Sequence, residues 1–191
     1  METSEGPQVI AFADATAFEA WLEAHHTLHE GIWMKIAKKA SGIASVTAPE
    51  ALDVCLCYGW IDGQRKALDA THFLQRYTPR RPRSLWSAVN IRKVEALTAA
   101  GRMRPPGLAA VAAAQADGRW EAAYASIAEA TVPPDLDAAL DANPAARAFF
   151  DTLDRTSRYA VLWPLMTART PATRTARLTR MIDTLAEGRR V

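Results

Sequence analysis

The hydrophobic pattern of the chain changes period near Trp120. Upstream, the stretch "GIWMKIAKK" at residues 31–39 alternates apolar side chains with other residues, and this period of two predicts a strand. Downstream, the alternation is absent and the apolar positions recur at helical intervals. We therefore predict an α+β fold, with a small sheet and β-hairpin covered by helices and an all-helical C-terminal tail. The expected domains are an α+β domain at residues 1–128 and a helical region at 129–191 packed on it.

Four helices and one hairpin are predicted in the first domain. The helices are expected at residues 14–26, 45–59, 84–100 and 108–118. Their expected N-caps are Asp14 or Thr16 for the first, Thr47 for the second and Ser84 for the third. Residues 60–68 and 71–79 are short, β-prone and joined by a polar link, which predicts the hairpin. Inside it, Asp62–Gly63 is expected to form a turn or a bulge.

The helical tail is predicted to contain three or four helices. Each begins at a capping residue or a proline, and the expected starts are Asp135, Asn143–Pro144, Thr156 or Ser157, and Thr170–Pro171. Arg174, Arg177 and Arg180 recur every three residues on the last of these helices. This basic stripe could contact anionic lipid or a partner, but its narrow apolar face favours docking on the preceding helices.

Positive charge is concentrated in one segment. The chain has 191 residues and a net charge of +2, whereas residues 65–93 hold eight basic side chains and a single acid, Asp69. Such a segment indicates a surface for anions. The near-neutral total and the lack of a recognition motif make nucleic acid an unlikely partner. No glycine-rich phosphate loop, serine elbow or paired-acid motif occurs, so we predict no cofactor.

The cysteines and the N-terminus predict a cytoplasmic location. Cys55 and Cys57 are two residues apart, so on a helix they point about 200° away from each other and cannot form a disulfide. Two unpaired thiols are typical of a reducing compartment. The opening "METSEGPQVIAFADA" has no basic leader followed by an apolar run, and no stretch approaches a membrane-spanning length.

Residues 57–90 hold the candidate site. Arg80, Arg81 and Arg83 precede the expected helix start at Ser84, where backbone N–H groups and guanidinium forks attract anions. Two tryptophans would provide a flat wall. The predicted ligand-binding residues are Trp60, Asp62, Arg76, Arg80, Arg83, Ser84, Trp86 and Asn90. The alternative is structural: the arginines pair with surface acids such as Asp62 and Glu95 while the tryptophans pack in the core.

Other chemistries have weaker signals. Asp62 is a weak candidate for a general base, because a turn role before Gly63 is simpler. Cys57 near the basic loop could be a reactive thiol, although its surroundings suggest a buried helix face. His25 and His29 are four residues apart, a spacing used for zinc, but two histidines make an incomplete site and we predict no metal.

Several motifs together resemble a known family. They are "LCYGWIDGQ", "YTPRRPRSLWSAVN", "GRM", "DGRW" and "ARTPATRTARLTRMIDTLAEG". In this order they look like the YdeI/OmpD-associated (OmdA) family of bacteriocin-protection proteins, with similarity from about Phe18 to Gly188. The resemblance implies a bacterial protein that contributes to stress or bacteriocin tolerance and has no established reaction. The family name also implies a porin association, from which this chain departs by lacking an export signal.

The function expected from these observations is the binding of an anion or acidic small molecule. Two alternatives stay open at this stage. One is an enzyme that acts on an acidic small molecule in the same pocket, with Asp62 as acid or base. The other is a structural or interaction module that acts on a protein partner through the helical tail.

Overall fold

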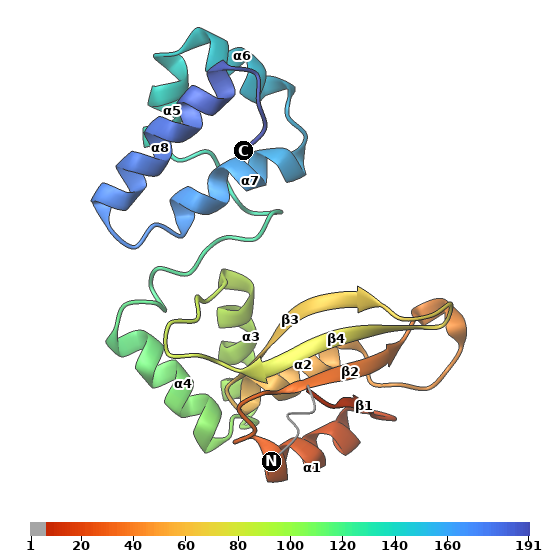
Figure 1. The fold of residues 1–191 in the computed structure, drawn as a ribbon. Coiled ribbons are helices and arrows are strands. Elements are labelled where there is room, and N and C mark those ends of the chain that lie inside the picture. The colour runs from red at the N-terminus through yellow and green to blue at the C-terminus, as the bar shows by residue number, and fades with distance from the viewer. Residues whose placement is uncertain (1–6) are drawn as a thin grey trace, which may run out of the picture. The chain divides into compact units, whose positions relative to one another are not determined.

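The computed structural model describes residues 7–191, which form two compact units (Figure 1). The first unit holds the residues up to Trp86 together with Asn90–Ala122, and the second holds Ser87–Val89 together with Ala123–Val191. The α+β fold class, with its small sheet and helical C-terminal region, is confirmed. The argument against a signal peptide rests partly on residues 1–6, which lie outside the described residues.

A four-stranded sheet with the order β1-β2-β4-β3 forms the centre of the first unit. Its strands are β1 Val9–Ala11, β2 Ile32–Ala37, β3 Trp60–Ala67 and β4 His72–Pro79. β1 runs parallel to β2, whereas β4 is antiparallel to both β2 and β3. The predicted strand β2 and the β3–β4 hairpin are confirmed. β1 escapes prediction because three residues are too few to display an alternation.

Local capping signals define where the first helices begin. The helices of this part of the chain are α1 Ala15–His25, α2 Ala48–Cys57, α3 Ala88–Ala99 and α4 Pro105–Ala116, with a short 3-10 turn at Lys39–Ser41. Asp14 caps α1, since its Oδ1 accepts a hydrogen bond of 2.8 Å from the Ala17 amide. Thr47 caps α2 as predicted, and together with Glu50 it forms a capping box.

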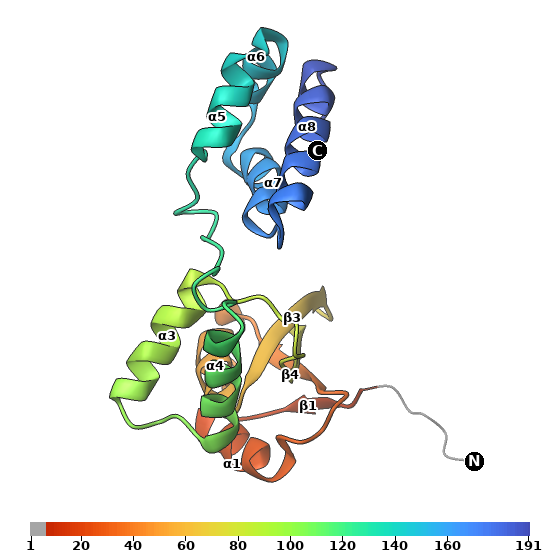
Figure 2. The same ribbon diagram turned by 90° about the vertical axis from the view of Figure 1, so that its left-hand side faces the viewer.

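Helices cover one face of the sheet. Ile32, Met34 and Ile36 of β2 are buried on this face, and the Phe18 ring of α1 lies 6.1 Å from the ring of Tyr77 on β4. Helix α2 packs against β3, and Figure 2 shows α3 and α4 to one side of β3 and β4. The residues that alternate with these buried ones along β2 and β4 point to the opposite face and are only partly buried. Trp33 on β2 and Arg76, which lies opposite it on β4, are among them.

The prediction that Ser84 caps the third helix is wrong. The Ser84 hydroxyl accepts a hydrogen bond of 3.0 Å from the Arg81 amide and closes a turn in the loop after β4. Helix α3 begins four residues later, at Ala88. The backbone just before it is extended, because Ser87 forms a parallel bridge with Tyr124 and the Ala88 amide donates to the Tyr124 carbonyl. A long-range pairing has therefore overridden a local capping signal.

The second unit is a cluster of four helices around its own core. They are α5 Pro134–Asp141, α6 Pro144–Thr152, α7 Arg155–Met166 and α8 Pro171–Ala186. Asn143 and Thr170 cap α6 and α8 as predicted. The prediction for α7 is wrong: Asp154 is its cap, and its carboxylate accepts from the Ser157 amide. The buried core consists of Leu136, Leu140, Ala146, Phe150, Leu153, Val161, Leu162, Leu165, Met181 and Leu185.

Within residues 7–191, no helix has both the length and the apolar character that are needed to cross a bilayer.

Candidate anion-binding site

A surface pocket of 540 Å³ lies in the first unit where β4 ends, and we call it the basic pocket. Its lining residues are Pro7, His29, Glu30, Arg76, Thr78, Pro79, Arg80, Arg81 and Pro82. They come from three parts of the chain: Pro7 before β1, the turn that leads into β2, and the end of β4 with the loop after it. Three arginines and one glutamate give the lining an excess of positive charge.

Arg76 is the central cation of the basic pocket. Its Nη2 donates a hydrogen bond to the Glu30 carbonyl, and its guanidinium carbon lies 5.6 Å from the centre of the Trp33 ring. Its Nη1 is buried and has no hydrogen-bond partner among residues 7–191. Burial lowers the pKa of Arg76, and the Glu30 carboxylate opposes this shift. The site therefore contains a partly desolvated guanidinium group whose Nη1 donates no hydrogen bond to residues 7–191.

The loop after β4 adds two further arginines. The guanidinium carbon of Arg80 lies 3.6 Å from the centre of the Trp86 ring, and Nη1 donates to the Leu85 carbonyl at 3.1 Å. This stacked position orients the guanidinium. The Arg81 side chain is exposed, and its main chain is held by the hydrogen bond to Ser84.

Gly31 brings the second chain segment to the pocket. Its φ of 65° is in the left-handed region, and a Cβ at this position would lie 2.2 Å from the Tyr77 carbonyl oxygen. Only glycine allows the turn and this close approach to β4. The turn delivers His29 and Glu30 to the side of Arg76.

The structure distributes the eight predicted ligand-binding residues over different environments. Arg76 and Arg80 line the basic pocket, whereas Trp60, Asp62, Arg83, Ser84, Trp86 and Asn90 do not. Trp60 is fully buried, and its Nε1 donates to the His26 carbonyl at 2.8 Å. Trp86 is 2% exposed and packs against the Trp120 ring at 5.0 Å. Both tryptophan rings are thus used by the core.

Asp62 lies on β3, directly before a bulge. The β3–β4 register shifts between Asp62 and Arg65. Of the two conformations predicted for Asp62–Gly63, a turn or a bulge, the bulge is the one that forms. Burial raises the pKa of Asp62, and the charges of Arg80 and Arg65 act in the opposite direction. The charges of Arg80 in the loop and Arg65 on β3 therefore act on its carboxylate, but Asp62 is not part of the pocket lining.

His29, Glu30 and Thr78 are pocket residues that the sequence prediction missed, and Arg81 was noted only as part of the basic run. The basic run was itself a signal for Arg81. No sequence signal identifies His29 and Glu30, because their place depends on the pairing of β2 with β4, which sets Ile32 opposite Tyr77.

Neither cysteine has the properties of a nucleophile. Cys55 and Cys57 are both buried and unpaired. Burial raises the pKa of each thiol, most strongly for Cys55. A reactive cysteine needs a lowered pKa and access to solvent, so neither residue is placed for such chemistry.

The histidine pair does not share a helix face. Helix α1 ends at His25, so His29 lies in the turn beyond it. The His25 ring stacks on Trp21 at 4.4 Å, and its Nδ1 contacts the Trp21 carbonyl. In the described part of the chain, no three His, Cys, Asp or Glu side chains are grouped so that they could hold a metal ion.

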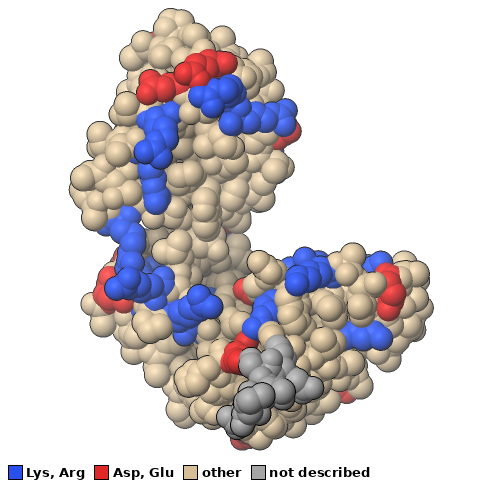
Figure 3. Space-filling model, viewed as in Figure 1, with Lys and Arg blue, Asp and Glu red and all other residues tan. Residues whose placement is uncertain are grey.

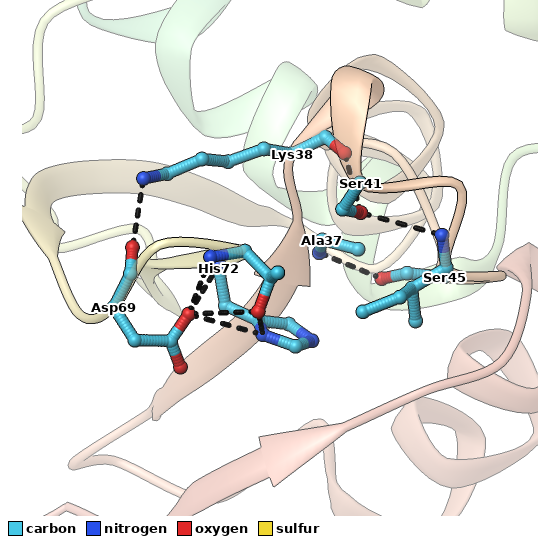
Figure 4. A network of polar contacts seen from close by, with 8 residues as sticks. Ala37, Lys38, Ser41, Ser45, Asp69 and His72 are labelled. Atoms are coloured by element: carbon cyan, nitrogen blue, oxygen red, sulfur yellow. Dashed lines mark hydrogen bonds and ion pairs between the residues drawn. The ribbon is translucent and has the colours of Figure 1, made fainter.

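The tip of the β3–β4 hairpin is fastened to the loop after β2 (Figure 4). Asp69 Oδ1 accepts hydrogen bonds from the amides of Thr71 and His72, both at 2.7 Å. These bonds hold the pKa of the Asp69 carboxyl well below its usual range. Lys38 Nζ donates to the Asp69 carbonyl at 2.8 Å. This polar network shapes the tip of the sheet and lies apart from the basic pocket.

The predicted basic stripe on α8 is largely used inside the second unit. Arg174 forms a two-bond contact with the Asp135 carboxylate at 2.7 and 2.8 Å and also donates to the Leu165 carbonyl. Arg177 donates to the Pro164 carbonyl at 2.6 Å. Two of the three arginines therefore attach α8 to α5 and to the C-terminal end of α7, which agrees with docking on the preceding helices.

Charge on the visible surface is divided among several groups. In Figure 3, lysine and arginine side chains form separate clusters, with a few acidic side chains close to some of them. On the outer part of the sheet, Lys66 Nζ lies 4.4 Å from the centre of the Trp33 ring, and the Arg65 guanidinium carbon lies at the same distance from the Phe73 ring. Two of the basic side chains in residues 65–93 therefore contact aromatic rings of the sheet.

Two family models match separate parts of the chain. One family model, described as a domain of unknown function (DUF8412), matches residues 10–110. A second, described as Bacteriocin-protection, YdeI or OmpD-Associated (OmdA), matches residues 129–188. The motifs in residues 57–90 that contributed to the sequence resemblance lie inside the first match. Searches of curated proteins and of solved structures found no match. The chain therefore belongs to the DUF8412 family, and its helical part, residues 129–188, is similar to the OmdA family of bacteriocin-protection, YdeI or OmpD-associated proteins.

Proposed function

We propose that this chain is a cytoplasmic protein that binds a small, oxygen-rich anion in the basic pocket. The observation that carries the proposal is the Nη1 group of Arg76. It is buried, and no described residue accepts its hydrogen bond. Leaving such a donor unsatisfied costs about 1–3 kcal/mol, and more for a charged group. A ligand oxygen would remove this cost.

The charges around this donor suit an anion. Arg76, Arg80 and Arg81 outnumber the single carboxylate of Glu30 in the pocket lining. Guanidinium groups bind carboxylate and phosphate through paired N–H groups. The volume of 540 Å³ is that of a small-molecule site. A carboxylate- or phosphate-bearing metabolite fits these properties.

The OmdA match supports a biological context for this binding. Its printed description refers to bacteriocin protection. We propose that ligand binding contributes to bacteriocin or stress tolerance in a bacterial cell. Binding is favoured over turnover because Asp62, the acid–base candidate, is absent from the pocket lining.

Titration calorimetry with inorganic phosphate, citrate and AMP tests the proposal. Arg81→Gln removes an exposed charge from the pocket without breaking a side-chain hydrogen bond or ion pair to residues 7–191, and we expect affinity to fall at least about fivefold. Arg83→Gln is the matched control. Arg83 is also an exposed arginine of the same loop but does not line the pocket, so its substitution should change affinity less than about twofold.

Two results would count against the proposal. The first is the absence of measurable binding of all three anions to a cooperatively folded protein. The second is equal weakening by Arg81→Gln and Arg83→Gln, which would indicate a general charge effect. Arg76→Lys adds a further check, because it keeps the charge but loses the guanidinium fork and should weaken binding more than Arg83→Gln does.

A further inference from the structure

A second pocket lies in the helical unit and contains two of the α8 arginines. It has a volume of 410 Å³ and is formed by the C-terminal half of α7 with Thr167 after it, by α8 and by Val191. The lining residues that matter for its chemistry are Trp163, Thr167, Arg177, Arg180, Met181 and Thr184. We call it the helical pocket.

Arg177 is held in position by the fold. Its Nη1 donates a hydrogen bond of 2.6 Å to the carbonyl of Pro164, near the end of α7, where carbonyl groups lack partners within the helix. This is the one hydrogen bond that the Arg177 guanidinium forms with residues 7–191. The remaining N–H groups of an oriented, half-buried guanidinium are thus available to a ligand.

Arg180 is one turn further along α8 and is the member of the basic stripe that the fold does not use. Its side chain is exposed, and it makes no hydrogen bond, ion pair or ring contact with the described residues. No aspartate or glutamate occurs among the described residues that line this pocket. The two guanidinium groups therefore face a site in which no described lining residue has an acidic side chain; Val191 is also part of this lining.

The remaining walls of the pocket are apolar. The Trp163 ring is fixed by an edge contact with Tyr124 at 4.5 Å and by Tyr159 at 6.1 Å. Met181 is 3% exposed and also lines the pocket. The hydroxyl groups of Thr167 and Thr184 donate to main-chain carbonyls, of Trp163 and Arg180 respectively, which leaves them as acceptors only.

A flat apolar wall next to two guanidinium groups selects for a ligand with both properties. We infer that the helical pocket binds an organic carboxylate that carries an aromatic or aliphatic body. The body lies against Trp163 and Met181, and the carboxylate is bound by Arg180 and Arg177. A free inorganic anion would leave the apolar wall in water, and a neutral aromatic would leave the arginines without a counter-charge.

Indole-3-acetate is a suitable probe, with indole-3-acetamide and acetate as controls for the charge and for the body. Calorimetry and NMR titration of the full chain should show binding of indole-3-acetate at least about tenfold tighter than of either control. Arg180→Gln should weaken this binding about tenfold. Arg169→Gln, a matched substitution of an exposed arginine outside the pocket, should leave it unchanged.

Arg177 is not a suitable test residue, because its loss would also remove the hydrogen bond to α7. Trp163→Leu is the second variant and should weaken indole-3-acetate binding without affecting acetate. Equal binding of the acid and the amide would overturn the inference, as would full affinity in Arg180→Gln. Binding of anionic lipid vesicles that depends on Arg180, without binding of indole-3-acetate, would also overturn it and would indicate a membrane surface. Arg81→Gln separates this site from the basic pocket, since it should leave indole-3-acetate binding intact.

Discussion

Arg76 has two roles that use different atoms of one guanidinium group. Nη2 holds the turn before β2 through the Glu30 carbonyl, and Nη1 remains buried without a hydrogen-bond partner in residues 7–191. Trp60 and Trp86, which were predicted to bind the ligand, are instead buried in the core. Large aromatic rings gain most from complete burial, and Trp60 has no accessible surface. At the scale of residues, the arginines rather than the tryptophans are the accessible part of the predicted motif.

Gly31→Ala is expected to destabilise the protein strongly. Adding a Cβ in the left-handed region costs about 1–2 kcal/mol, and the clash with the Tyr77 carbonyl adds about 1–3 kcal/mol. Gly42→Ala is the matched control, because Gly42 has a similar φ of 68° but a Cβ there would meet nothing within 4 Å. Urea unfolding should show a loss about 2 kcal/mol greater for Gly31→Ala. Equal losses would show that the close approach to β4 is unimportant.

At the scale of elements, hydrogen bonds at a loop tip determine where the β3–β4 hairpin turns. Leu68–Thr71 form the connection, and Asp69 accepts the amides of Thr71 and His72 within it. The Asp62–Gly63 pair, which the sequence also allows as a turn, forms the bulge instead. Both sites have turn chemistry, and the pairing of β3 with β4 decides between them.

The Asp69 carboxylate should make the stability of the protein depend on pH. Its pKa is lowered in the folded protein, so its contribution is present above the unfolded value of about 3.9 and is lost as the pH falls through the folded value. Asp69→Ala should therefore be less stable than the wild type at pH 7, and the difference should shrink below about pH 4. Chemical denaturation at a series of pH values measures this.

Glu23→Ala is a suitable control for that series. Glu23 is exposed and its carboxylate forms no hydrogen bond or ion pair with the described residues. The difference between Glu23→Ala and the wild type should be small at every pH. A difference for Asp69→Ala that stays constant from pH 7 to pH 3 would contradict the role assigned to the carboxylate.

At the scale of the whole molecule, each compact unit has its own hydrophobic core. The first is formed between the sheet and α1 and α2, and the second by α5 to α8. The packing of residues 129–191 on the first domain stays a prediction. Separate cores suggest that a defect in one unit has mainly local effects.

Leu140→Ala should reveal how independent the helical core is. Leu140 is fully buried, and truncation of such a leucine costs about 2–5 kcal/mol. Hydrogen–deuterium exchange should become faster in α5 to α8 and remain unchanged in β2 and β4. Leu108→Ala, at a position 47% exposed, should change exchange in neither unit. Faster exchange throughout the chain in Leu140→Ala would show that both cores unfold together.

Much of the fold could be predicted because its signals are local. A cap at Asp14 or Thr47, a proline in the first turn of α8 and the alternation in β2 each act within a few residues, and all of them occur as expected. The prediction at Ser84 failed because the backbone before α3 pairs with Tyr124, and the prediction for α7 failed because the neighbouring Asp154 caps the helix. Local propensity was outweighed there by tertiary contacts.

The amino-acid sequence alone determines the helices, the hairpin, the change from mixed to helical structure and the positive charge near β4, because these depend on side chains that are close in the chain. The basic pocket depends on the tertiary structure. Its arginines and its His29–Glu30 segment are joined by the pairing of β2 with β4 and by the turn at Gly31, which are contacts between residues about fifty positions apart. Such contacts leave no periodic trace in the sequence, so the arginines could be predicted as a group but the site that they form could not.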